Sequence, residues 1–226
     1  MDTATLIRVA HASGGIVYIM ALLLLIALTV IFERSWYLRR LIRKGDTITR
    51  TVAALTHLDI KTVRDLSERY KRFPLGAVLV VPLHYPEVTD PVRLSELLEE
   101  AIMWQVPKID RSLWMLDTIV TLAPLLGLLG TIIGMFNAFQ VLGSSSGGAP
   151  TQITGGVAEA LVATACGLFI AIIGLVFFNS LQNLVRRVVH QMETLKVMLV
   201  NRVDAPRAVE PASPPKIRAM AGAREG

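Results

Sequence analysis

Three polar side chains, Thr131, Glu159 and Thr164, lie in stretches that are otherwise apolar. Glu159 is the only charged residue between positions 118 and 185. An ionisable residue inside a membrane is a functional candidate by default, because burying its charge in lipid is costly. A threonine hydroxyl donates and accepts hydrogen bonds but does not titrate at any useful pH, so it can bind water or a proton carrier without storing a proton.

The two threonines are predicted to lie at similar depths, if their helices cross the membrane in opposite directions. Thr131 lies about 11 residues from the outer end of its helix, or ~16 Å, and Thr164 about 8 residues, or ~12 Å. Both hydroxyls could line one polar path. Alternatively, each could donate to a carbonyl of its own helix, as threonines in membrane helices do.

Glu159 lies nearer the outer end, about one turn into its helix. The helix macrodipole favours a negative charge there by ~0.3–1 kcal/mol. The residue is therefore either an ordinary interfacial acid or a functional group at the mouth of a path.

Small residues accompany these polar groups at three- and four-residue steps. Such faces let membrane helices approach closely, and packing alone is the simpler explanation for them. The set consists of Gly127, Gly130, Gly134, Ala160, Ala163 and Gly167.

Three segments are long and apolar enough to position these residues in a bilayer, since a span needs about 20 apolar residues. They are residues 13–33, 118–142 and 156–182. The first has no cleavage site and its basic residues follow it, so we interpret it as a retained helix. The sequence predicts an all-α integral membrane protein with three transmembrane helices. The second and third helices are expected to extend into a cytoplasmic helical bundle.

Charge predicts the orientation. Of 23 Lys and Arg residues, one precedes the first span, 14 fall between residues 34 and 111, and eight follow residue 185. Basic residues accumulate on the cytoplasmic side. The N-terminal segment 1–12 and the loop 143–155 are therefore expected in the periplasm, and segments 34–117 and 183–204 in the cytoplasm. The net charge of +5 needs no nucleic-acid partner to explain it.

The cytoplasmic segments are predicted to be helical. Asp59 is a candidate N-cap, and the helix around Pro107 is expected to bend there and run on into the second span. The apolar run 76–81 has no clear assignment, and the tail, residues 205–226, is predicted to be disordered. Two apolar stripes at helical spacing support the bundle: Leu94, Leu97, Leu98, Ala101 and Ile102, and then Leu184, Val188, Met192, Leu195 and Leu199.

Neither an enzyme nor a cofactor is predicted. The single cysteine, Cys166, excludes an intrachain disulfide, and the four histidines are scattered, so no metal site is indicated. No catalytic triad or phosphate-binding loop is visible.

Four motifs resemble the MotA/TolQ/ExbB proton channel family over roughly residues 14–190. The short N-terminus and outer loop are more similar to its ExbB branch, and next to TolQ, than to MotA, whose pattern has four spans. The motifs are "FERSWYLRR" (32–40), "LEEAIMWQVPKIDRSLWMLDTIVTLAP" (98–124), "LAPLLGLLGTIIGMFNAF" (122–139) and "EALVATACGLFIAI" (159–172).

The resemblance implies a homopentamer in the bacterial inner membrane, enclosing the single-span helices of an ExbD-like partner dimer. It also implies that proton motive force drives a TonB-like transducer for outer-membrane import of iron carriers and vitamin B12. It places Thr131 and Thr164 in the pore and Glu159 at its mouth, with the proton-binding aspartate in the partner and the small residues making room for the partner's helix. A TolQ-like role in outer-membrane integrity and a non-conducting scaffold are the alternatives.

Overall fold

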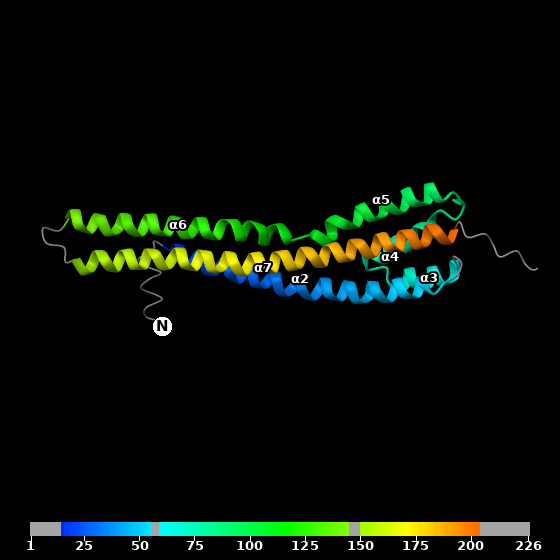
Figure 1. Cartoon of the computed structure of the whole chain (residues 1–226), viewed down its shortest axis with the longest axis horizontal. Helices are drawn as coiled ribbons and strands as arrows, with labels where there is room; N and C mark the ends of the chain where they lie inside the picture. The colour runs from blue at the N-terminus through cyan, green and yellow to red at the C-terminus, as the bar shows by residue number, and fades with distance from the viewer. Residues whose placement is uncertain (1–14, 56–58, 145–149, 204–226) are drawn as a thin grey trace, which may run out of the picture.

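The computed structural model describes residues 15–55, 59–144 and 150–203. Within these ranges the chain forms six α-helices and no strand, as predicted. Three long helices run side by side along an elongated molecule, and three short helices gather at one end (Figure 1). The predicted periplasmic segment 1–12 and the tail 205–226 lie outside the described residues.

The long helices are α2 (Ile16–Ala53), α6 (Leu113–Ser144) and α7 (Pro150–Val203). Each contains a stretch long and apolar enough to cross a membrane. The three predicted spans are therefore confirmed as helices that can span a bilayer.

Two of the three long helices continue well beyond the apolar segments. As predicted, α7 is one continuous helix of 54 residues. Helix α2 also continues, for 20 residues beyond Glu33 to Ala53, an extension that the sequence analysis did not predict. Its extension is stabilised by buried apolar residues at helical spacing: Leu38, Leu41, Ile48 and Val52.

The expected continuous helix through residues 98–124 is interrupted. Helix α5 (Pro91–Asp110) ends before Ser112, which has a left-handed φ of 75°, and α6 begins at Leu113. A contact distant in sequence lies at this break: the guanidinium of Arg34 donates from Nη2 to Ser112 Oγ at 3.1 Å. Arg34 is only 5% exposed, so this pairing fixes the joint between α5 and α6 against α2.

The helix register follows from close contacts at glycines. Met20 of α2 lies against Gly167 of α7, and Gly45 of α2 lies against Gln191 of α7. In these two contacts the residue number on α7 exceeds that on α2 by 147 and 146, so α2 and α7 run parallel. Helices α6 and α7 are antiparallel. Because α7 begins at Pro150, α6 and α7 project as a pair beyond the start of α2 (Figure 1).

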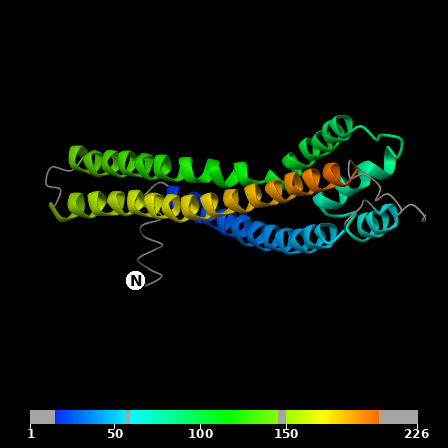
Figure 2. The same ribbon diagram turned by 45° about the vertical axis from the view of Figure 1, so that its right-hand side comes forward.

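The short helices α3 (Ile60–Arg69), α4 (Pro74–His84) and α5 pack around the far ends of α2 and α7 (Figure 2). The core combines both predicted stripes: Leu94, Leu98 and Ile102 of α5 are buried together with Val188, Met192, Leu195 and Leu199 of α7. This end of the molecule is therefore a helical bundle stabilised mainly by apolar burial.

Helix α4 accounts for the unassigned run 76–81. Pro74 occupies its first turn, where a missing N–H costs nothing. Leu75, Val78 and Leu79 are fully buried. Helix α5 likewise continues past Pro107 to Asp110, so that proline does not end it.

Asp59 caps α3, as predicted. Its carboxylate accepts hydrogen bonds from the backbone N–H of Lys61 at 3.2 Å and from the hydroxyl of Thr62 at 2.6 Å. The Thr62 hydrogen bond is the main reason why the pKa of Asp59 lies below its ordinary value of 3.8. The cap thus stabilises the fold at neutral pH and loses its contribution as the pH falls below that value.

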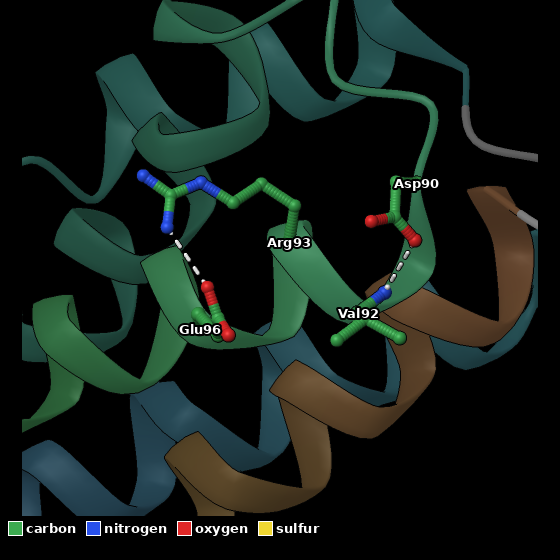
Figure 3. Close-up of polar contacts among 4 residues, drawn as sticks. All are labelled: Asp90, Val92, Arg93 and Glu96. Carbon is green, nitrogen blue, oxygen red and sulfur yellow. Dashed lines mark hydrogen bonds and ion pairs between the residues drawn. The ribbon is translucent and has the colours of Figure 1, made fainter.

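The start of α5 uses the same device. Asp90 accepts a hydrogen bond from the backbone N–H of Val92 at 3.1 Å, and Arg93 pairs with Glu96 at 2.8 Å one turn further (Figure 3). Both contacts are exposed, so they define where the helix begins more than they stabilise the fold.

The helical hairpin is longer than predicted. Helix α6 reaches Ser144 and α7 starts at Pro150. Residues 150–155, which the sequence placed in the outer loop 143–155, are therefore helical.

Arg202 joins the ends of α2 and α7. It donates from Nε to the Leu55 carbonyl at 2.7 Å and from Nη2 to the Ala53 carbonyl at 3.0 Å, while Nη1 reaches the Met198 carbonyl at 3.0 Å. The last carbonyls of a helix have no intrahelical partner, and here α7 supplies the donor.

Replacing Arg202 with Met is expected to lower stability by about 1–2 kcal/mol, because the terminal carbonyl of α2 at Ala53 and the carbonyl of Leu55, just beyond the helix, lose a charged donor. Thermal unfolding of the purified protein in detergent measures the loss. Arg64→Met, at an exposed position on α3, is the matched control. Equal stability of the two variants would contradict the role of Arg202.

Candidate functional site

The residues predicted to form a polar path lie on the two antiparallel helices α6 and α7. Thr131 is in the middle part of α6, and both Glu159 and Thr164 are on α7. The side chain of Glu159 is outside what the structure describes, so its predicted role at the mouth of a path stays a prediction.

Thr164 connects the two helices directly. Its hydroxyl donates to the backbone carbonyl of Gly127 on α6 at 2.9 Å, and the side chain is half-buried. For this threonine the structure does not show the intrahelical bond that we considered as the alternative. A hydroxyl that pairs across helices in this way stabilises membrane helix packing modestly, by about 0.6 kcal/mol on average.

Thr131 makes the intrahelical bond. Its hydroxyl donates to the carbonyl of Leu128 at 2.7 Å, one turn earlier in the same helix. A hydroxyl oxygen has two lone pairs, so it can accept a hydrogen bond from another molecule while it donates this one.

The two threonines lie within one turn of each other. In an α-helix the N–H of residue 131 bonds the carbonyl of residue 127, and that carbonyl of Gly127 also accepts from Thr164. The two residues therefore lie at similar levels along the α6–α7 pair, as their predicted similar depth requires. Their level corresponds to the start of α2, since Ile16 lies 3.8 Å from a Cβ built on Gly130.

The small residues form the contact between α6 and α7. A Cβ built on Gly130 would lie 2.8 Å from that of Ala163, and one built on Gly134 would lie 2.7 Å from that of Ala160. Ala160 and Ala163 are 2% and 0% exposed. Within one chain, these small residues thus allow α6 and α7 to pack closely. Packing was the simpler of the two explanations for their spacing in the sequence.

Among the glycines between α6 and α7, Gly167 allows the closest approach, and it lies where these two helices meet α2. A Cβ there would lie 2.5 Å from the backbone carbonyl oxygen of Ala123 and 3.1 Å from Cε of Met20. Gly127 is similarly confined by the backbone of Thr164. These faces are filled by the chain's own helices, so an added partner helix must pack on another surface.

The outer surfaces of α6 and α7 are apolar and exposed. Leu125, Phe136 and Phe139 on α6, and Phe169 and Ile172 on α7, are each at least 60% exposed. Such side chains require contact with lipid or with other apolar protein surfaces. Cys166 is also exposed.

The hydrogen-bond acceptor at Gly127 and the Arg34–Ser112 pair were missed by the sequence analysis. The glycine pattern marked where helices approach, but a backbone carbonyl leaves no signal of its own. Arg34 was visible as a charge directly after the first span; its partner, 78 residues away, was not.

Within the described residues, no group of three His, Cys, Asp or Glu side chains could hold a metal ion. Apart from Glu159, the side chains of α6 and α7 between residues 118 and 181 offer as polar groups only hydroxyls, the thiol of Cys166 and the amides of Asn137, Gln140, Gln152 and Asn179.

The sequence profile of the MotA/TolQ/ExbB proton channel family matches residues 72–194, which is more than half of the chain. A Synechocystis protein named biopolymer transport protein ExbB-like 1 is 35% identical over 175 residues, which cover 76% of this chain and 68% of that protein. ExbB-like 3 of the same organism is 31% identical over 195 residues, covering 84% and 92%. The Tol-Pal system protein TolQ of Pseudomonas aeruginosa is 35% identical over 86 residues, covering 38% and 37%.

Replacing Gly167 with Ala is expected to destabilise the protein by about 1–3 kcal/mol, because the new methyl group meets the backbone of α6. Thermal unfolding in detergent measures this. Gly155→Ala is the control, since a Cβ there meets nothing within 4 Å and alanine favours helix by about 1 kcal/mol. A Gly167→Ala protein as stable as the control would refute the close contact.

Proposed function

The chain belongs to the MotA/TolQ/ExbB proton channel family, and we propose that it is an ExbB-like subunit of a motor driven by proton motive force. The family consists of membrane channel subunits and is not an enzyme family. In the proposed complex, several copies, five by analogy, surround an ExbD-like partner dimer and act on a TonB-like transducer. The work serves outer-membrane import of iron carriers and vitamin B12.

The observation that carries this proposal is that Thr131 of α6 and Thr164 of α7 lie at similar levels, within about one helical turn of each other. The Gly127 carbonyl accepts from Thr164, and Thr131 lies one helical turn away, with its hydroxyl oxygen able to accept a further bond. This cluster lies at a level where the apolar surroundings offer few other polar groups. It can therefore hold a water or pass a proton to and from a titrating group.

The titrating group comes from another chain in this proposal. Threonine does not ionise, and Glu159 is the only acidic residue between positions 118 and 185. By resemblance, the partner's single helix supplies an aspartate. Since the small-residue faces are occupied within the chain, this helix would contact surfaces formed where copies of the chain meet.

The charge distribution supports a location in the inner membrane, with the N-terminus in the periplasm. One of the 23 Lys and Arg residues, Arg8, precedes the first span. The other 22 lie between residues 34 and 111 or after residue 185, at the end of the molecule that holds the helical bundle or beyond it in the chain. Basic residues mark the cytoplasmic side, so the bundle of α3, α4 and α5 faces the cytoplasm.

A TolQ-like function is the second candidate, because relatives of both names match the chain. A knockout that becomes sensitive to detergent but grows normally under iron limitation favours TolQ; the reverse phenotype favours ExbB. A non-conducting scaffold is distinguished from both by the absence of proton flux when flux is measured directly.

Proteoliposomes that contain this chain and its partner test conduction. An imposed pH gradient is expected to collapse faster than in liposomes with this chain alone, and replacement of the partner's aspartate should abolish the difference. A gradient that persists with the assembled wild-type complex would favour the scaffold.

Thr131→Val and Thr164→Val are each expected to reduce partner-dependent proton flux to the background of liposomes with this chain alone, while assembly persists. Thr164→Val removes one interhelical bond worth only ~0.6 kcal/mol, so loss of flux cannot be attributed to unfolding. Thr29→Val is the control, because its hydroxyl also bonds its own helix, at 2.8 Å to Leu25, but lies on α2. Normal flux in both variants would exclude the threonines from the path.

Helix α7 begins at Pro150, so Glu159 lies nine residues into it and not the one turn that the sequence suggested. Glu159→Gln is still expected to slow flux without abolishing it, since Glu159 lies closer to the outer end of α7 than Thr164 does, where it gates or attracts protons but does not store them. The comparison is with an Asp→Asn change in the partner, which should abolish flux. Total loss in both would contradict this ranking.

A further inference from the structure

A polar groove lies between α2 and α7, away from the threonine cluster. It has a volume of about 570 Å³. Its lining consists of Ile42 and Asp46 from α2 and Asn183, Arg186, Arg187, His190 and Gln191 from α7. Because both helices also form the membrane-spanning part of the protein, the depth of this groove relative to the bilayer can be derived.

The groove begins where the hydrocarbon ends. The apolar part of α2 stops at Phe32, and the register of α2 with α7 places Arg34 level with residue 180 or 181. Arg186 follows about six residues later, about 9 Å along the helix. The headgroup layer adds roughly 5–8 Å beyond the hydrocarbon, so the flexible arginine side chains reach phosphate level.

Exposed tryptophans mark the same boundary. Trp36 on α2 and Trp114 at the start of α6 are 65% and 68% exposed. Tryptophan is enriched at the membrane–water interface because its ring is apolar and its N–H is polar. Both lie near the level of the Arg34–Ser112 contact, which supports the depth assigned to the groove.

The charges of the groove favour an anion. Arg186 donates to the neutral side chain of Asn183 at 2.8 Å. Among the described residues, neither Arg186 nor Arg187 forms an ion pair. Asp46 accepts from Gln191 at 2.7 Å and lies further from the membrane than both arginines. Two guanidinium groups against one carboxylate leave the groove with a positive charge.

We propose that this groove binds the headgroup of an anionic phospholipid. Guanidinium groups match phosphate oxygens in geometry and charge, and basic pockets between membrane helices on the cytoplasmic side are suited to anionic headgroups. The acyl chains extend toward the apolar surfaces of α2 and α7, which continue directly from the groove. Asp46, at the far end, accepts hydroxyl groups of a headgroup such as glycerol.

A lipid is favoured over a soluble phosphate because the groove opens at the boundary of the bilayer, where lipid phosphates are concentrated. It is also favoured over a zwitterionic lipid, because an ammonium headgroup gains from Asp46 but adds its positive charge to that of the arginines. The proposal depends on depth and charge only, so it stands independently of proton conduction.

The test is native mass spectrometry of the purified full-length protein, titrated in detergent with phosphatidylglycerol, phosphatidylethanolamine, phosphatidylcholine and inorganic phosphate. Phosphatidylglycerol is expected to bind at least about tenfold more tightly than phosphatidylcholine, because a charge-assisted contact changes affinity on that scale. Phosphate should not displace it at equal concentration. Tighter binding of phosphatidylethanolamine, or full displacement by phosphate, overturns the proposal.

The double variant Arg186→Gln/Arg187→Gln is expected to weaken phosphatidylglycerol binding by about tenfold or more. The double variant Arg64→Gln/Arg69→Gln, exposed on α3, removes the same charge away from the groove and should bind as the wild type does. Equal binding by both variants overturns the proposal. The proposal is also overturned if the groove variant binds lipid as the wild type does but no longer associates with other copies of the chain. That result would mean that the groove contacts a neighbouring copy. If the groove variant fails to fold, the relative affinities of the wild-type protein for the three lipids and for phosphate test the proposal.

Discussion

The backbones of α6 and α7 lie almost in contact, and the arrangement of the apolar half of the molecule depends on that approach. In lipid the hydrophobic effect does not drive helices together, so close van der Waals packing and interhelical hydrogen bonds must do so. Glycines 127, 130, 134 and 167 make the approach possible, and the hydroxyl of Thr164 bonds a carbonyl that only a side chain this close could reach. The same contact that stabilises the pair therefore also brings the two threonines together.

The other half of the molecule is stabilised differently. In water, burial of Leu38, Leu98 and Leu195 supplies the driving force, and polar contacts determine where helices end. Arg34 marks the border between the two halves, where it reaches Ser112 and lies 5.4 Å from the ring centre of Tyr37. A charge that follows a membrane span normally stays in the headgroup layer; here it is buried and contacts the residue at which α5 and α6 are separated.

Much of the fold was predictable from the sequence, because it depends on local pattern. The three spans, the stripes on α5 and α7, and the Asp59 cap each follow from spacing within one helix. The break at Ser112 was not predictable, since no turn signal marks it locally and the residue that contacts it, Arg34, is distant in sequence. The extension of α2 contains a repeat of apolar residues at helical spacing. Eight charged residues from Glu33 to Arg50 are interspersed with this repeat and make it difficult to recognise. At the site, spacing predicted the depth of the threonines, whereas the direction of each hydroxyl depends on which helix offers a nearby carbonyl.

The continuity of α7 has a mechanical consequence. Its 54 residues correspond to about 81 Å of uninterrupted helix, and α6, by contrast, is separated from α5 at Ser112. A stiff rod fixed near its middle behaves as a lever: a tilt of about 5° displaces one end relative to the other by about 7 Å over that length. Any shift of α7 at the level of Thr164 is thus transmitted to Arg202 and the end of α2, while the α5–α6 joint is the point at which the neighbouring segment can bend.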